Sequence, residues 1–265
     1  MTFRKLLVLM AVSCLLVATA YADTPSINAG ASGSADFTEP DGGAMVLYDQ
    51  TDNASGNGAP DQDFEAAYDA YDSKAADDFD VDWPDGWDVS GINTVGTTGG
   101  GASTSVDVTF IADNGGTPLG GTEVCSYVDV TDYTDNAGSL SINLDPICHL
   151  PMGLHWVAIQ TEQSFGASGQ HFWSNRASDT NAPGHWRNPG DGFGNGCTDW
   201  AVAGATCGVG GGFNDLLFQV VGTLGAPPPP DDPTIEVPTL GQFGIAALIL
   251  ALLGAGVTRL RRRDS

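Results

Sequence analysis

Carboxylates are the most abundant groups in this chain that could do chemistry, and four of them lie close together at Asp77, Asp78, Asp80 and Asp82, before the Pro84-Asp-Gly turn. Calcium prefers hard oxygen ligands from Asp, Asn and backbone carbonyls, so this run is a candidate calcium site. The spacing does not reproduce an EF-hand loop, which needs Asx residues at alternate positions, a Gly and a later Glu. A solvated acidic face is the alternative interpretation, and no other cofactor is indicated.

Aromatic and basic side chains gather in and beside a long irregular segment late in the chain. The set comprises Trp173, His185, Trp186, Arg187 and Trp200. Loops on a rigid β scaffold often carry binding residues, and exposed aromatic rings stack on sugars, so these residues are a candidate ligand platform for polysaccharide. The alternative is that the Trp side chains fill the core under the loops.

Short catalytic motifs are missing from the sequence. Gly166-Ala-Ser-Gly169 is one residue short of a nucleophile elbow, and neither a His-Glu-x-x-His helix nor a phosphate loop with Lys occurs. We therefore assign no catalytic residue and predict a non-enzymatic protein. The alternative is an extracellular hydrolase of surface polysaccharide, which would need an Asp or Glu with a raised pKa in an apolar cleft.

The charge balance is strongly acidic, with 33 Asp and Glu against 9 Lys and Arg and a formal net charge of −24. Between the two chain ends the only basic residues are Lys74, Arg176 and Arg187. Phosphate backbones are bound by Lys and Arg, so the composition excludes nucleic acid as a partner.

Four cysteines, Cys125, Cys148, Cys197 and Cys207, follow the N-terminal region. None is spaced as Cys-x-x-Cys, so zinc binding is disfavoured and two disulfides are predicted, as in exported proteins. Proximity in sequence favours pairing the first with the second and the third with the fourth, but four cysteines allow three pairings, and the choice stays open.

The elements that must position these residues are strands. Phe79, Val81 and Trp83 alternate with Asp78, Asp80 and Asp82, which predicts one face on a core and one in water. Similar runs separated by Gly, Asn and Pro turns recur up to residue 224, and no stretch resembles a long helix. We predict an all-β fold, an antiparallel, jelly-roll-like β-sandwich over residues 45–224.

The N-terminus is typical of an exported protein. Arg4 and Lys5 precede an apolar run, and Ala20 and Ala22 provide the small residues of a cleavage site, so residues 1–22 are predicted to be a signal peptide. Its partners would be the Sec export machinery and signal peptidase. Residues 23–44, rich in Gly, Ala, Ser and Asp, are predicted to be a flexible leader or one loosely docked on the domain.

The C-terminus combines a Pro- and Asp-rich spacer, 225–236, with a tail, 237–265. An apolar stretch at about 243–260 is near the lower length limit of a transmembrane helix. The basic end carries Arg261, Arg262 and Arg263, which the positive-inside rule places in the cytoplasm. We predict that the domain before it faces outward and that the helix contacts the membrane.

This tail resembles the IPTL-CTERM class of bacterial sorting signals, relatives of PEP-CTERM, in Val237, Pro238, Thr239, Leu240 and Gly244. It departs from the family motif by Val for Ile, Gln for Glu and Phe for Trp. The resemblance implies processing by an exosortase-type protease. The implied location is the envelope of a Gram-negative bacterium, with export across the inner membrane, at least transient anchoring, and then the cell surface or extracellular matrix.

The domain itself resembles β-sandwich ectodomains that precede such tails in Gram-negative bacteria, through Ala75-Ala-Asp-Asp-Phe79 and Trp186-Arg-Asn-Pro-Gly190. That resemblance carries no catalytic residues. The sequence thus predicts a surface or matrix protein, with polysaccharide or calcium as the candidate ligands.

Overall fold

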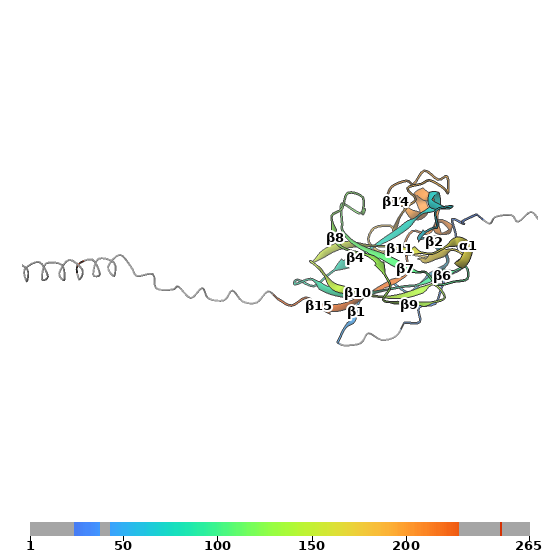
Figure 1. The fold of residues 1–265 in the computed structure, drawn as a ribbon. Helices are drawn as coiled ribbons and strands as arrows, with labels where there is room; N and C mark the ends of the chain where they lie inside the picture. The colour runs from blue at the N-terminus through green and yellow to red at the C-terminus, as the bar shows by residue number, and fades with distance from the viewer. Residues whose placement is uncertain (1–23, 38–42, 228–249, 251–265) are drawn as a thin grey trace, which may run out of the picture. The chain divides into compact units, whose positions relative to one another are not determined.

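The computed structural model describes residues 24–37, 43–227 and 250 (Figure 1). Residues 1–226 and 227–265 are separate units. The predicted signal peptide, the spacer beyond Pro227, the sorting motif, the arginine cluster and, apart from Leu250, the predicted span lie outside the described residues. No helix among the described residues is long and apolar enough to cross a membrane.

Antiparallel strands make up most of the first unit, which confirms the all-β class. One sheet has five strands in the order β1-β15-β5-β10-β9. These strands are β1 (Met45–Asp49), β15 (Phe218–Leu224), β5 (Trp87–Thr94), β10 (Ser139–Leu150) and β9 (Tyr133–Asn136).

A second sheet has seven strands, six of them in the order β14-β13-β4-β11-β7-β8. They are β14 (Ala201–Val202), β13 (His185–Arg187), β4 (Lys74–Val81), β11 (Gly153–Glu162), β7 (Ser105–Ala112) and β8 (Glu123–Val130). The seventh, β3 (Gln62–Asp63), pairs in parallel with the end of β11.

A smaller sheet contains β2 (Ala54–Pro60), β12 (His171–Arg176) and β6 (Gly96–Thr98). The helices within residues 43–227 are all short: η1 (Asp69–Tyr71), α1 (Phe165–Ser168), the π-helix η2 (Ala203–Cys207) and η3 (Gly210–Gly212).

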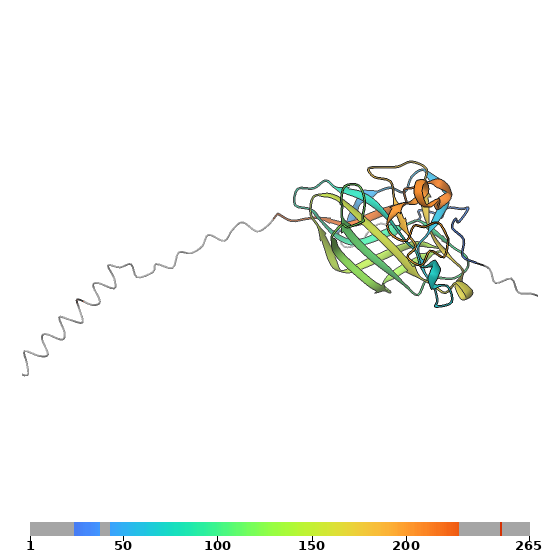
Figure 2. The same ribbon diagram turned by 90° about the horizontal axis from the view of Figure 1, so that it is seen from above.

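The main core lies between the two larger sheets, which form the layers seen in Figures 1 and 2. Phe79 of β4 stacks on Trp87 of β5, with ring centroids 6.1 Å apart and an interplanar angle of 8°. Phe218 of β15 packs edge-on against Phe79 at 6.2 Å. Alternate residues on each strand therefore meet across the layers, as in a sandwich.

The period-two prediction for β4 is right at four positions and wrong at two. Phe79 and Val81 are buried, and Asp80 and Asp82 are exposed. Asp78, however, is fully buried, because β4 is paired on both sides and its outer face is covered by a second apolar cluster that includes Trp156.

Trp83 was predicted to face the core and is 40% exposed. It lies two residues beyond the end of β4 at Val81, so the alternation of the strand no longer sets its direction. Its ring Nε1 donates to the Gly225 carbonyl at 3.3 Å.

Of the two interpretations of the leader, flexible or loosely docked, residues 24–37 are found in contact with the domain. The backbone N–H of Ser26 donates to the Gln170 side chain at 2.6 Å, and that of Ala29 donates to the Gly58 carbonyl at 3.2 Å. A Cβ on Gly33 would lie only 1.9 Å from the Gly96 oxygen. Glycine thus permits the close approach that holds this segment on the smallest sheet.

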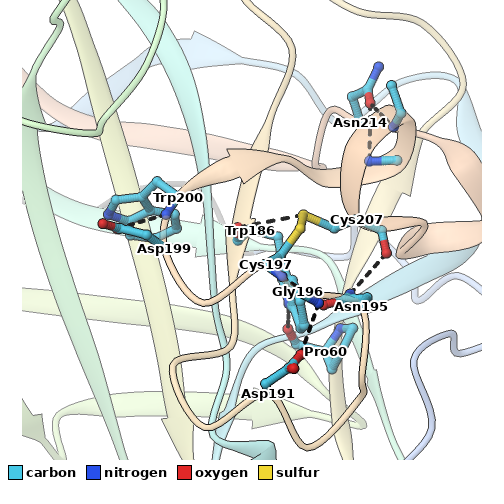
Figure 3. The surroundings of a disulfide bond; sticks show 12 residues. Pro60, Trp186, Asp191, Asn195, Gly196, Cys197, Asp199, Trp200, Cys207 and Asn214 are labelled. Atoms are coloured by element: carbon cyan, nitrogen blue, oxygen red, sulfur yellow. Dashed lines mark hydrogen bonds between the residues drawn. A yellow bond between two sulfur atoms is a disulfide. The ribbon is translucent and has the colours of Figure 1, made fainter.

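The two predicted disulfides form between neighbours in sequence. Cys125–Cys148 joins β8 to β10 and so ties the two larger sheets together. Cys197–Cys207 closes a short loop within the irregular segment, close to the Trp186 carbonyl (Figure 3).

Candidate functional site

A surface groove of about 610 Å³ runs beside the Cys125–Cys148 disulfide. Strand β8 is the last strand of its sheet, and β9 pairs with β10 only from Ser139 to Ile142. Beyond Ile142, β10 pairs with β5 at Asn143 and again from Cys148 to Leu150, with an irregularity between them. The groove lies where these two sheet edges approach each other.

The groove combines polar and apolar side chains. Its polar lining comprises Ser126, Thr131, Asp132, Asn143 and Asp145. Its apolar lining includes Tyr127, Val128 and Ile147, and the last two are 67% and 57% exposed. Exposed aliphatic groups beside oxygen acceptors suit a ligand with both C–H faces and hydroxyls.

Tyr127 is held in place across the groove. Its hydroxyl donates to the Pro146 carbonyl at 2.6 Å, which links β8 to β10. Partial burial, together with the negative charge of Asp145, raises the pKa of the Tyr127 phenol, so the hydroxyl stays protonated and remains a donor. The ring is thereby fixed as a partly exposed surface.

Asn143 and Asp132 form a polar pair at the groove. Asn143 Nδ2 donates to Asp132 Oδ1 at 3.1 Å, and the Asn143 backbone N–H donates to the Asp132 carbonyl at 2.9 Å. Within the described residues, the Asn143 side-chain oxygen accepts no hydrogen bond. The pair can accept hydrogen bonds from neighbouring hydroxyls while its own geometry stays fixed.

The predicted aromatic platform is buried. Trp173 and Trp186 are fully buried, and their ring N–H groups donate to the carbonyls of Leu217 and Pro60. His185 is 5% exposed and packs edge-on against Trp156 at 4.9 Å. The binding interpretation is wrong for these three residues, because their apolar area fills the core under the long loops.

The last two predicted platform residues do meet. The Arg187 guanidinium lies 4.6 Å from the ring centroid of Trp200, a cation–π contact. Trp200 is 9% exposed, and Figure 3 places it away from the Cys197–Cys207 disulfide.

The four candidate calcium aspartates do not converge. Asp77 and Asp78 are successive residues of one strand and point to opposite faces of it, while Asp80 and Asp82 are exposed. Among residues 24–37, 43–227 and 250, no group of three or more His, Cys, Asp or Glu side chains could hold a metal ion.

Asp77 and Asp78 instead belong to a buried carboxyl cluster with Asp215. Asp77 accepts from Gln50 Nε2 at 2.8 Å and from the Leu216 N–H at 2.7 Å. Burial raises the pKa of all three carboxyls. Repulsion by Asp215 adds to the upward shifts of Asp77 and Asp78, and repulsion by Asp179 adds to that of Asp215. The pKa values of Asp78 and Asp215 are raised to about 7.

A different arrangement surrounds Asp61 and His171, which are 1% and 0% exposed. His171 Nδ1 lies 2.6 Å from Asp61 Oδ1, and Nε2 lies 2.8 Å from the Gly138 carbonyl oxygen. Both contacts are with oxygen acceptors, so a doubly protonated imidazolium satisfies them. Burial lowers the pKa of His171, but Asp61 and the carbonyl raise it further, and the net shift is upward.

Sequence reasoning missed the groove. Its polar pair comes from the β8–β9 loop and from β10, neither of which carries a motif. The one available signal was the favoured Cys125–Cys148 pairing, which places residues near 125 beside residues near 148.

No protein-family model and no curated protein sequence matches this chain. A solved structure of the cysteine protease and lectin-like domains of Cwp84, a surface layer associated protein of Clostridium difficile, matches with a TM-score of 0.44 and 11% identity. The match covers 70% of this chain but only 37% of the other. A likeness at this level carries no argument about function.

Proposed function

We propose that this chain is an exported, non-enzymatic protein of the cell surface or extracellular matrix that binds a neutral polysaccharide in the groove between β8 and β10. The observation that carries the proposal is the groove itself, in which a fixed Tyr127 ring lies near the acceptor pair Asp132 and Asn143. A sugar ring presents both an apolar face and hydroxyls, and this lining suits both.

A neutral ligand is favoured by the charges of the groove. Asp132 and Asp145 line it, whereas no Lys or Arg does. Both carboxylates accept hydrogen bonds from sugar hydroxyls but would repel an anionic chain.

Binding is favoured over hydrolysis by where the raised pKa values lie. A glycosidase acid needs a carboxyl with a raised pKa that faces its substrate. Asp77, Asp78 and Asp215 have raised pKa values but are fully buried. Asp63 and Asp72 also have raised pKa values and are less buried, but none of the five lines the groove. A surface hydrolase therefore remains the less supported alternative.

Export is supported by the two disulfides, which are typical of oxidising compartments. Together with the predicted signal peptide and sorting tail, they lead us to propose export by the Sec machinery and cleavage near Val237–Leu240 by an exosortase-type protease. The intact mass of the native protein tests this. A chain ending near Leu240 in the extracellular fraction is expected, and a full-length chain found only in membranes would contradict the processing step.

Binding is tested with the full-length chain and a panel of neutral polysaccharides, by affinity electrophoresis. Tyr127→Ala is expected to weaken retention by about tenfold, whereas Tyr127→Phe, which keeps the ring, should retain most of it. Asn143→Ala is expected to weaken retention, and Asn136→Ala, an exposed residue of β9, is its matched control.

Two results would overturn the groove as a binding site. One is that the wild-type chain is retained by no polysaccharide in the panel. The other is that retention is unchanged in both Tyr127→Ala and Asn143→Ala while their thermal unfolding matches that of the wild type.

A further inference from the structure

A second, smaller cleft holds two of the three basic residues found between residues 24 and 227. Lys74 of β4 and Arg187 of β13 are directly paired in register, so their side chains emerge on the same face, side by side. The third basic residue, Arg176, is ion-paired with Asp52 at 2.7 Å.

Among the residues that the structure describes, no carboxylate lies within ion-pair distance of either cation in the cleft, although the charges of Asp107, Glu123 and Asp63 act on Lys74. Within the described residues, Lys74 and Arg187 form no ion pair and no side-chain hydrogen bond. Two like charges directly opposite each other in a sheet repel, so a neighbouring carboxylate would be expected to neutralise them. The chain has 33 acidic residues that could do so. Burial and, to a smaller extent, Arg187 lower the pKa of Lys74, although nearby carboxylates oppose this.

The position of the Arg187 side chain suits it to bind an anion. Its guanidinium carbon lies 4.6 Å from the centroid of the Trp200 ring, a cation–π contact that restrains the side chain. Since the Arg187 side chain donates no hydrogen bond within the described residues, its N–H groups are available for a planar, bidentate contact with a carboxylate. The ammonium of Lys74 adds a second charge from the neighbouring strand.

The rest of the cleft limits the kind of anion. Glu123 and Asp199 also line it, and both are exposed. Two carboxylates near the cations would repel a doubly charged phosphate or a sulfate more than a single carboxylate. They would also accept hydrogen bonds from hydroxyls on the same ligand. The cleft has a volume of about 230 Å³, below the usual range for drug-sized ligands, which suits a single sugar residue.

We propose that this cleft binds a sugar acid, with the carboxylate of a uronic-acid residue on Arg187 and Lys74 and its hydroxyls on Glu123 and Asp199. The site is separate from the groove between β8 and β10 and does not depend on it. The chain would thus recognise a neutral polysaccharide at one place and a terminal or branching uronate at another.

The test is isothermal titration of the full-length chain with trigalacturonate, and with galactotriose, inorganic phosphate and inorganic sulfate as comparison ligands. Trigalacturonate is expected to bind saturably and at least about tenfold more tightly than each of the other three. Lys74→Met and Arg187→Gln should each weaken it by about tenfold or more. Arg176→Gln makes the same change in net charge outside the cleft and should leave the affinity unchanged.

Several outcomes would overturn the sugar-acid site. These are equal affinity for trigalacturonate and galactotriose, phosphate or sulfate binding as tightly as trigalacturonate, an equal loss in Arg176→Gln, and no saturation below about 10 mM. Comparison of the four ligands on the wild-type chain decides the question even if a cleft variant does not fold. Tyr127→Ala, a groove variant, should leave trigalacturonate binding unchanged, so failure of either site can be told from failure of the other.

Discussion

Asp61 and Asp77 are both buried aspartates of the same domain, and they differ in the charge of the groups beside them. Asp61 faces His171 at 2.6 Å, so its negative charge is matched by an imidazolium. No cation among the described residues pairs with Asp77, which accepts hydrogen bonds from two amide groups and is repelled by the carboxyls of Asp215 and Asp78. The first region buries a charge pair, whereas the second buries carboxyls that keep their protons to a higher pH. The difference teaches that the partner of a buried carboxyl, rather than its burial alone, decides its charge.

Breaking the charge pair is expected to have the largest effect on stability. Asp61→Ala leaves His171 buried beside the Gly138 carbonyl without its counter-ion. Removing one partner of a buried pair costs about 3–5 kcal/mol, because an uncompensated charge remains. Urea unfolding at pH 6 measures the change. A loss below about 1 kcal/mol would mean that His171 is neutral in the native state.

The pH dependence of the wild-type chain sharpens the comparison. The native state keeps the protons of Asp77, Asp78 and Asp215 above the usual aspartate pKa of 3.8, so over that range the unfolded chain binds fewer protons. The free energy of unfolding should then fall by several kcal/mol as the pH rises from about 4 to about 7.

His171 adds a second decline with pH in a higher window. Its pKa is raised from 6.5 in the native state, so its contribution is complete below pH 6.5 and is lost as the pH rises through the raised pKa. Urea unfolding measured in steps from pH 4 to pH 9 separates the two windows. A stability that rises between pH 4 and pH 7 would contradict the assignment for the carboxyl cluster.

A single substitution in the carboxyl cluster should reduce the first decline. Asp78→Asn copies the protonated form, since Asp78 Oδ2 accepts from the Ala182 N–H at 3.1 Å and Asp78 Oδ1 has no partner in the described residues. We expect a gain of about 1–2 kcal/mol at pH 8 and little change at pH 4. Melting curves at the two pH values measure it, and an equal effect at both would show that the Asp78 carboxyl does not titrate.

An exposed His–Asp pair provides the control for the buried one. His149 Nδ1 lies 2.7 Å from Asp88 Oδ1, nearly the same distance as in the buried pair, but the side chains are 57% and 28% exposed. Surface ion pairs contribute about 0–1 kcal/mol, so His149→Ala should change the free energy of unfolding by less than about 1 kcal/mol. A loss as large as that of Asp61→Ala would mean that burial does not explain the difference.

The smallest expected effect concerns calcium. Asp77 and Asp78 point to opposite faces of β4, and Asp80 and Asp82 are exposed, so we propose that these four bind no calcium together. Adding calcium or a chelator should leave the melting temperature of the full-length chain unchanged. A rise with calcium that is lost in Asp80→Asn but kept in Asp129→Asn, an exposed aspartate of β8, would restore the calcium interpretation.

Much of the fold was predictable, because it depends on local patterns. Alternation at Phe79 and Val81 identified β4 and its inner face, and the Gly- and Asn-rich turns separated the strands. The short loops between Cys125 and Cys148 and between Cys197 and Cys207 favoured the pairings that form. The candidate ligand residues were less predictable. A Trp residue such as Trp173 or Trp186 looks the same in the sequence whether its side chain binds sugar or fills the core.

What the sequence alone determined was the class of fold, the expectation of two disulfides and the acidic character, because these follow from residue types and their near neighbours. The structure decided between the three possible disulfide pairings. Only the tertiary structure decided which carboxyls are buried, since Asp78 and Asp80 lie on one face of β4 and differ only in what covers them. It also decided that Lys74 and Arg187 meet and that β8 and β10 enclose a groove. The burial of a side chain and the pairing of a strand depend on segments that are distant in sequence. The spacing of residues within one segment does not indicate which distant segments these are.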